Sequence, residues 1–152
     1  MFEKAVKLFV KGNHFEKTLG ATLSVQTPGE ISYELTIEEK HLSSPSTAHG
    51  GVLAALMDSI LGVAALTHAF TRNHICSTIE FKINYLRPVK LGDVLTGKGR
   101  VVHKGNRIVV SQGEIHRPGK SGNEVVASGL GTFNLYPMEK SAFHELLGED
   151  EV

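Results

Sequence analysis

The stretch AHGGVLAALMDSILGVAALTHAF, residues 48–70, decides the fold. Between Gly50 and Ala69 it carries one charged side chain, Asp58, among aliphatic and small residues. Its length is near the ~20 residues that cross a membrane. A carboxylate near its middle, however, opposes insertion by about 2.5–3.5 kcal/mol. We therefore predict a buried core helix over about 49–70 and no membrane insertion.

Strand-like runs lie on both sides of this helix. They cover 18–27 and 30–39 before it, and 75–86, 94–103, 107–116 and 124–136 after it. A helix that is apolar nearly all round has to be buried, and only one long helix separates the strands. The sequence therefore predicts an α+β fold, with an antiparallel β-sheet wrapped around one long central α-helix.

The 152 residues show no linker or repeat and are predicted to form one domain, 1–152. A short helix is expected over 1–12, and an acidic C-terminal tail over 138–152. The run 75–86 alternates strictly, which predicts a half-buried strand. Its first face would carry Ile75, Ser77, Ile79, Phe81, Ile83 and Tyr85, and its second Cys76, Thr78, Glu80, Lys82 and Asn84. Ser46 or Thr47 is expected to cap the central helix.

The charges exclude some classes of partner. Sixteen basic and sixteen acidic residues balance, so no bulk field favours nucleic acid or an anionic membrane. The single cysteine, Cys76, fits a reducing compartment, and we predict a cytoplasmic protein. No histidines have the spacing of a zinc site, so no metal is expected.

Asp58 needs an explanation, because an ionised group out of water costs several kcal/mol unless it is paired. The helix opens with His49, Gly50 and Gly51, whose free N–H groups are suited to an oxyanion. Nine residues of helix separate Asp58 from His49 by ~13 Å. Two antiparallel helices of a two-fold dimer would bring them together. A stripe of small residues would permit that approach: Gly51, Ala55, Gly62 and Ala65. The alternatives are a local hydrogen bond to Asp58 and a glycine pair that serves only packing.

The segment HGGVLAALMDS (49–59) resembles the HGG…D signature of the hotdog-fold thioesterases, and within them the PaaI-type branch. The likeness extends to PGEISYELTIEEKH (28–41) and INYLRPVKLGD (83–93). It implies a sheet around a central helix and paired dimers that form a homotetramer. It also implies hydrolysis of acyl-CoA thioesters to free acid and CoA.

The resemblance assigns roles to individual residues. Asp58 would be the general base or nucleophile, and would reach the site of the partner subunit. Gly50, with Gly51, would offer backbone N–H groups to the thioester oxygen, and His49 would brace that turn. Thr78 would position the water.

Ser43 departs from the family pattern, which has an asparagine there. Serine is shorter and has no amide NH2 to donate. This departure keeps open a non-catalytic acyl-CoA-binding protein. A hotdog hydratase acting on enoyl or hydroxyacyl thioesters is a further, weaker alternative, and product analysis separates it from hydrolysis.

The CoA part of the substrate is expected at two segments, with no separate cofactor. The first is Tyr85, Leu86, Arg87, Pro88, Val89 and Lys90, and the second is His103, Lys104, Gly105, Asn106, Arg107 and Ile108. Their cations suit phosphates, and a glycine turn exposes backbone amides. The acyl chain is expected beside the central helix, against Leu61 and Ala65.

Overall fold

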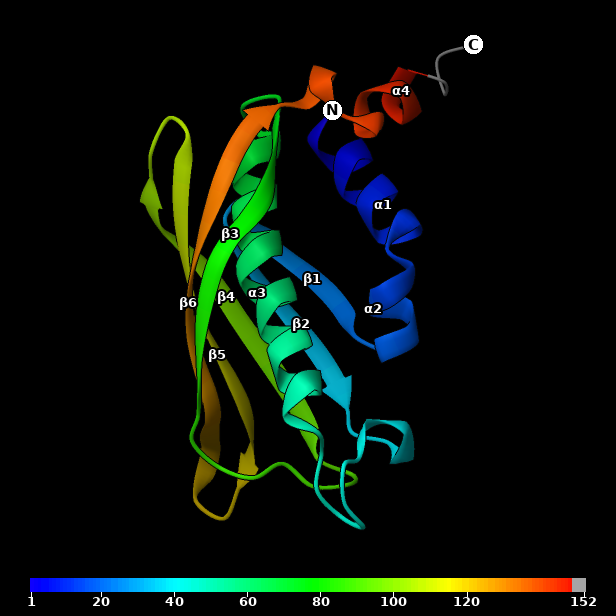
Figure 1. Cartoon of the computed structure of the whole chain (residues 1–152), viewed down its shortest axis with the longest axis vertical. Helices are drawn as coiled ribbons and strands as arrows, with labels where there is room; N and C mark the ends of the chain where they lie inside the picture. The colour runs from blue at the N-terminus through cyan, green and yellow to red at the C-terminus, as the bar shows by residue number, and fades with distance from the viewer. Residues whose placement is uncertain (149–152) are drawn as a thin grey trace.

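A computed structural model describes residues 1–148. One six-stranded antiparallel sheet, in the order β1-β2-β4-β5-β6-β3, lies on one side of a long helix, α3 (Figure 1). The strands are β1 (Thr22–Thr27), β2 (Glu30–Thr36), β3 (His74–Tyr85), β4 (Val94–Lys104), β5 (Ile108–Gly119) and β6 (Gly122–Pro137). The helices are α1 (Phe2–Gly12), α2 (His14–Leu19), α3 (Gly50–Phe70) and α4 (Ala142–Gly148), with short 3-10 turns η1 (Glu39–His41) and η2 (Met138–Lys140). The predicted α+β hotdog architecture is confirmed.

The main core lies between α3 and the sheet. Leu56, Met57, Ile60 and Leu61 of α3 are fully buried there, because the sheet curls around the helix. On the other side of α3 lie α1 and α2 (Figure 1). Within residues 1–148, α3 is the one helix long and apolar enough to cross a membrane by length and composition. It forms the centre of the core instead.

A row of glycines lets α3 lie close to the sheet. Gly99 of β4, Gly113 of β5 and Gly129 of β6 stand directly opposite one another in the strand register. A Cβ atom on Gly99 would lie 2.6 Å from the backbone oxygen of Ile60. One on Gly129 would lie 2.6 Å from the sulfur of Met57. The absence of side chains along this row therefore allows α3 to pack closely against the middle of the sheet.

The second helix, α2, was not predicted. The Asn13 side chain accepts a hydrogen bond from the N–H of Glu16 at 3.1 Å and so begins a new helix one residue after α1 ends. Gly20, with φ of +86°, ends it. The strand expected from residue 18 therefore begins at Thr22, because the capped helix takes the residues before it.

The strict alternation predicted for β3 is wrong. Thr78 pairs with Phe133, but Glu80 pairs with Thr132, so Ile79 is an extra residue at a β-bulge. Ile79 is 55% exposed as a result. The bulge puts residues from both predicted faces on the side toward α3, namely Cys76, Thr78, Phe81 and Ile83.

The chain ends of the described region meet in a second apolar cluster. Ala5 of α1, Phe70 of α3, Ile75 of β3, and Met138 and Leu147 near the end form its buried members. Of the acidic tail predicted over 138–152, residues 138–148 form η2 and α4. Residues 149–152 lie outside the described residues.

Candidate active site

The opening of α3 is capped by His49. Its Nδ1 accepts a hydrogen bond of 2.7 Å from the N–H of Gly51. Among the hydrogen bonds of residues 1–148, none engages the N–H of Gly50. That N–H points out of the first helical turn, where the partial positive charge of the helix dipole also lies. One backbone donor is thus available for an oxyanion, and it belongs to Gly50 rather than Gly51.

The expectation that Ser46 or Thr47 caps the helix is wrong. The preceding segment is held extended, because the N–H of Ala48 bonds to Val89 O at 2.8 Å and Thr47 forms a bridge with Lys90. The chain can therefore turn into the helix only at His49. The His49 N–H donates to His41 O at 2.8 Å, which ties the same turn to η1.

Tyr85 also contacts the helix opening. Its hydroxyl donates a hydrogen bond of 2.8 Å to the carbonyl oxygen of Gly50. The tyrosine ring packs beside Gly50, and a Cβ atom at that position would lie 3.5 Å from it, in ordinary van der Waals contact. Tyr85 is at the end of β3, so this bond attaches the end of the edge strand to the first turn of α3.

The Asp58 side chain is half-buried at the middle of α3. Its Oδ1 accepts a hydrogen bond of 3.1 Å from the hydroxyl of Thr78, which the bulge in β3 has turned toward the helix. Within residues 1–148, Oδ2 accepts no hydrogen bond. The local hydrogen bond considered as an alternative for Asp58 therefore exists, and it leaves one carboxylate oxygen open to a ligand.

Asp58 opens into a cleft of about 230 Å³. On α3 the cleft is lined by Gly62, Val63 and Leu66, and the N-terminal helices add Phe9, Asn13 and Glu16. Leu61 and Ala65, the predicted acyl contacts, do not line this cleft, since both are 0% exposed. One residue along a helix is a rotation of about 100°, enough to exchange the cleft face for the core face.

Two further ionisable groups belong to this cleft. The thiol of Cys76 donates a hydrogen bond of 3.7 Å to Gly62 O. Burial, and next the charge of Asp58, raises the pKa of Cys76 to about 12, so it stays a protonated, weakly nucleophilic thiol. Glu16 accepts a 2.7 Å bond from the buried Tyr33 hydroxyl. Burial and then the Glu16 charge raise the pKa of Tyr33 far above its ordinary value, so it remains a donor.

The structure keeps Asp58 and Gly50 apart within one chain. Both lie on α3, eight residues apart, which is ~12 Å along the helix axis. The stripe of small residues predicted beside Asp58 is partly open: Gly51 is exposed and Ala55 and Gly62 are half-buried, whereas Ala65 is fully buried. Ser43 lies in the exposed loop before α3, where its N–H bonds to Thr47 O, and it does not line the Asp58 cleft.

The two predicted CoA segments lie at opposite ends of the molecule. Residues 85–89 border a cleft of about 260 Å³ beside the opening of α3. Residues 103–108 form the turn between β4 and β5, and β4 alone spans ~35 Å. Arg72, just beyond the other end of α3, holds that turn by a 2.9 Å bond to Gly105 O. One chain therefore does not bring the segments together.

Within the first predicted CoA segment, residues 85–90, the side chains differ in their exposure and in their hydrogen bonds. Val89 is 2% exposed and belongs to the core, so it contributes through its backbone. Arg87 donates a 2.7 Å bond to Val125 O, and Lys90 is exposed.

Sequence reasoning missed the N-terminal contribution to the Asp58 cleft, although Phe2, Val6 and Phe9 at helical spacing signalled an amphipathic α1. It also missed Arg117, described below.

Comparison with known proteins places the chain in a family. The thioesterase superfamily profile matches residues 46–128, which include α3 and most of the sheet. Human acyl-coenzyme A thioesterase 13 is 29% identical over 133 residues, 87% of this chain and 92% of that protein. A thioesterase structure with coenzyme A from Streptococcus pneumoniae has a TM-score of 0.73 at 27% identity, covering 84% and 97% of the two chains. The E. coli PaaI protein shares the fold, with a TM-score of 0.76 at 22% identity over 89% and 93%. The chain is a hotdog-fold thioester hydrolase and belongs to the thioesterase superfamily.

Proposed function

We propose that the protein hydrolyses acyl-CoA to free acid and CoA at a site shared by two subunits. The observation that carries this is the separation of the two functional groups on α3. The open N–H of Gly50 and the open oxygen of Asp58 lie ~12 Å apart in one chain. A single thioester carbonyl cannot contact both, whereas a second α3 running antiparallel would supply the missing group to each site.

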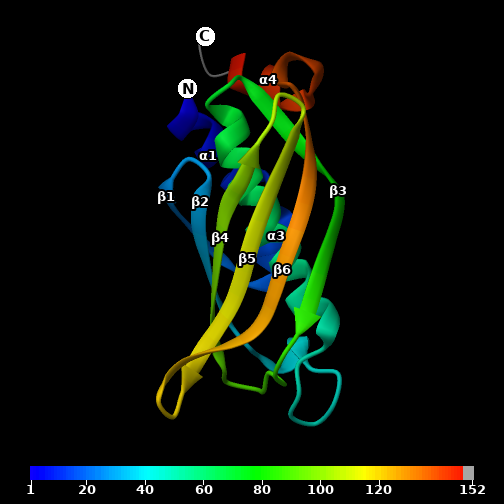
Figure 2. The ribbon, with the colours of Figure 1, turned by 90° about the vertical axis from the view of Figure 1, so that its left-hand side faces the viewer.

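The free edge of the sheet supports such a dimer. Figure 2 shows β1 and β3 at the two margins of the sheet, and β3 is the longer, with 12 residues. An unpaired strand edge offers N–H and C=O groups to a second chain. Antiparallel pairing of two β3 strands would continue the sheet and set the two α3 helices antiparallel. We expect two such dimers to form a cytoplasmic homotetramer.

The groups of the site suggest how hydrolysis proceeds. The thioester oxygen accepts a hydrogen bond from the Gly50 N–H, and the helix dipole stabilises the tetrahedral oxyanion. Asp58 of the partner subunit either takes a proton from water, which attacks the carbonyl carbon, or attacks it directly to give an anhydride that water then opens. The C–S bond breaks, and the CoA thiolate leaves and receives a proton.

Thr78 is expected to orient the Asp58 carboxylate. Thr78→Val removes the hydroxyl at nearly constant volume and should lower kcat about tenfold with little change in KM, since a hydrogen bond to a charged group is lost. Thr78→Ser should keep most of the rate. The measurement is steady-state thiol release from an acyl-CoA.

A matched control exists on the other face of the sheet. The Thr132 hydroxyl donates a 2.6 Å bond to Glu80, so Thr132→Val also breaks a threonine–carboxylate bond, but at an exposed position. It should leave kcat unchanged. Equal losses of rate in the two valine variants would contradict the role given to Thr78.

The acyl group is proposed to occupy the Asp58 cleft. Its lining mixes polar residues with apolar side chains, and the apolar ones include Phe9, Val63, Leu66 and Phe133. Its volume of about 230 Å³ exceeds the ~150 Å³ of a cavity that holds benzene. An aromatic ring or an aliphatic chain of similar bulk would therefore fit, and Phe9 of α1 would limit its length.

Phe9→Ala is expected to move the preference toward longer acyl groups. Removing the ring lengthens the cleft, and each additional buried methylene favours binding by about 1 kcal/mol. The optimum of kcat/KM across a series of straight-chain acyl-CoAs should shift by about two to four carbons.

Phe143→Ala is the control, because Phe143 packs on the second apolar cluster and does not line the cleft. That variant should be less stable and keep the wild-type profile. An unchanged profile in a folded Phe9→Ala protein would remove Phe9 from the acyl site.

A further inference from the structure

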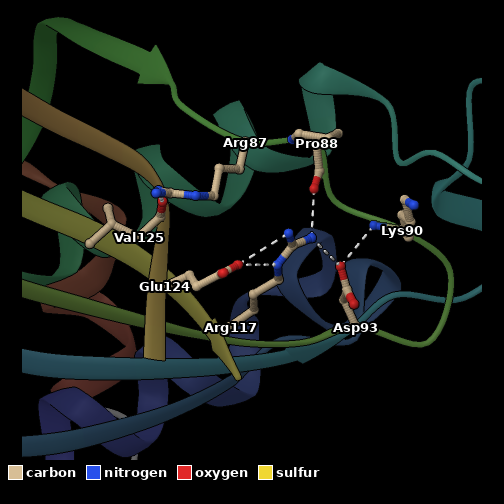
Figure 3. A network of polar contacts seen from close by, with 7 residues as sticks. All are labelled: Arg87, Pro88, Lys90, Asp93, Arg117, Glu124 and Val125. Carbon is tan, nitrogen blue, oxygen red and sulfur yellow. Dashed lines mark hydrogen bonds and ion pairs between the residues drawn. The ribbon is translucent and has the colours of Figure 1, made fainter. Parts of the chain in front are cut away.

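Arg117 of β5 joins three segments of the chain through its guanidinium group. Its NH1 donates to Pro88 O at 2.6 Å and to Asp93 Oδ2 at 3.0 Å. Its Nε and NH2 both donate to Glu124 Oε2 at 3.3 Å. Figure 3 shows the guanidinium between these partners, on the inner side of the segment that links β3 to β4. We call that segment, residues 86–91, the strap.

Asp93 closes the strap into a turn. Its Oδ2, which Arg117 contacts, also accepts a 2.8 Å bond from the N–H of Lys90. Gly92, with φ of +84°, provides the sharp change of direction between them. At the start of the strap, Arg87 reaches Val125 O of β6 (Figure 3). The strap is thus held at its beginning, middle and end by the β5–β6 hairpin.

The other edge of the strap supports the helix opening. Val89 O accepts from the N–H of Ala48, and the N–H of Leu91 donates to Ser46 O at 3.0 Å. The carbonyl held by Arg117 belongs to Pro88, the residue directly before Val89. Arg117, the strap and the residues before His49 therefore form one connected network.

Four of the five guanidinium N–H groups of Arg117 donate to protein acceptors. All its donor nitrogens are engaged, and its side chain is 18% exposed. Burial alone would lower the pKa of Arg117, but hydrogen bonds and charge from Asp93, and then from Glu124, outweigh it and raise the pKa. The group is therefore a permanent cation committed to protein partners, whereas Lys90 on the strap is exposed to solvent.

We propose that Arg117 is a positioning residue that fixes the strap in the conformation that binds the CoA moiety. This inference rests on the proposed function, together with the expectation from the sequence that CoA binds at residues 85–90. A strap ordered before binding does not lose conformational entropy when CoA arrives, so affinity depends on the Arg117 network. Arginine is required because the nitrogens of its planar guanidinium donate to Pro88, Asp93 and Glu124 in different directions at once. The single ammonium nitrogen of a lysine does not match this arrangement of acceptors.

The test compares the full-length Arg117→Met and Arg117→Lys proteins with wild type. Calorimetry gives the Kd for free CoA, and steady-state assays give kcat and KM for an acyl-CoA and for the same acyl-pantetheine, which lacks the nucleotide. Both variants should raise the Kd for CoA and the KM for acyl-CoA about tenfold, with kcat within about threefold. The kcat/KM for acyl-pantetheine should change less than about twofold.

Arg100→Met is the matched control, since Arg100 has a single 3.4 Å contact to Gln112 on the exposed face of the sheet. It should bind CoA as wild type does. The proposal is overturned if Arg117→Met loses only thermal stability, if Arg117→Lys restores affinity, or if acyl-pantetheine suffers equally. It is also overturned if wild type fails to bind CoA. If wild type binds CoA but hydrolyses no acyl-CoA, the proposed function fails while the Kd comparison still decides the role of Arg117.

Discussion

Asp58→Asn is expected to lower kcat about 1,000-fold in a protein that remains folded. The amide is close in size to the carboxylate, and its oxygen can still accept the hydrogen bond from Thr78. It can neither take a proton from water nor attack a thioester. Because the side chain is only half-buried, the free energy of unfolding should change little.

The rate is measured as thiol release from a panel of acyl-CoAs, in a Cys76→Ser background that removes the protein's own thiol. Glu80→Gln makes the same chemical change at the exposed pair with Thr132 and should retain the full rate. Full turnover by folded Asp58→Asn would exclude Asp58 as base or nucleophile. A wild type that binds acyl-CoA without hydrolysing any would point to a binding protein.

The same variant tests whether the site is shared between chains. Gly50 is the first residue of α3, and His49 before it has φ and ψ of −65° and 135°, the conformation that a following proline requires. Gly50→Pro should therefore remove the N–H and preserve the helix. Mixed and reassembled with Asp58→Asn, it would form heterodimers with one intact site.

If two inactive proteins regain about a quarter of the wild-type rate on mixing, the shared site is supported, since half of random dimers are hybrids with one site each. If hybrids form but activity does not recover, Gly50 of one chain and Asp58 of the other do not act in the same site, and the shared site is contradicted.

Gly99→Ala is expected to lower the free energy of unfolding by about 2–3 kcal/mol. The new methyl group would lie 2.6 Å from the backbone oxygen of Ile60, which cannot turn away as a side chain can. Helix α3 would have to move off the sheet along its length. Urea denaturation at one fixed chain concentration gives the comparison, because association adds to apparent stability.

Gly12→Ala is the matched control. Gly12 is the last residue of α1, no atom lies within 4 Å of the position its Cβ would take, and alanine favours helix. It should be neutral or stabilise by up to about 1 kcal/mol. Equal stability of Gly99→Ala and wild type would mean that the helix does not rest on the glycine row as tightly as described.

The fold followed from the sequence because its main signals are local. One apolar run of helical length among strand-like runs allows few arrangements, and α3 and all six strands formed in the expected order, although β1 begins four residues later and β2 ends three residues earlier than expected. The short helix α2 escaped prediction because its cap, Asn13, acts over three residues, and the run TLGATLSVQT after it favours a strand. The glycine row was invisible, since its members are brought into line only by strand register.

The site was predictable only in part, for the same reason. The relation of His49, Gly50 and Asp58 lies within one helix and can be counted. Which residues beside Asp58 face the cleft depends on how α3 is rotated against the sheet, and the chosen Leu61 and Ala65 each lie one position before a residue that lines it. The pairing of Arg117 with Asp93 links positions 24 residues apart that carry no common motif.

Ile79 gives β3 two halves whose side-chain alternation is out of phase. Before the bulge, Cys76 and Thr78 face α3, and after it Phe81 and Ile83 do. The first half serves the chemistry and the second serves the core, so substitutions can alter one without disturbing the other. The number of residues in β3, by contrast, cannot change without affecting the site. Deleting Ile79 would keep every other residue of the protein, yet turn the Thr78 hydroxyl away from Asp58.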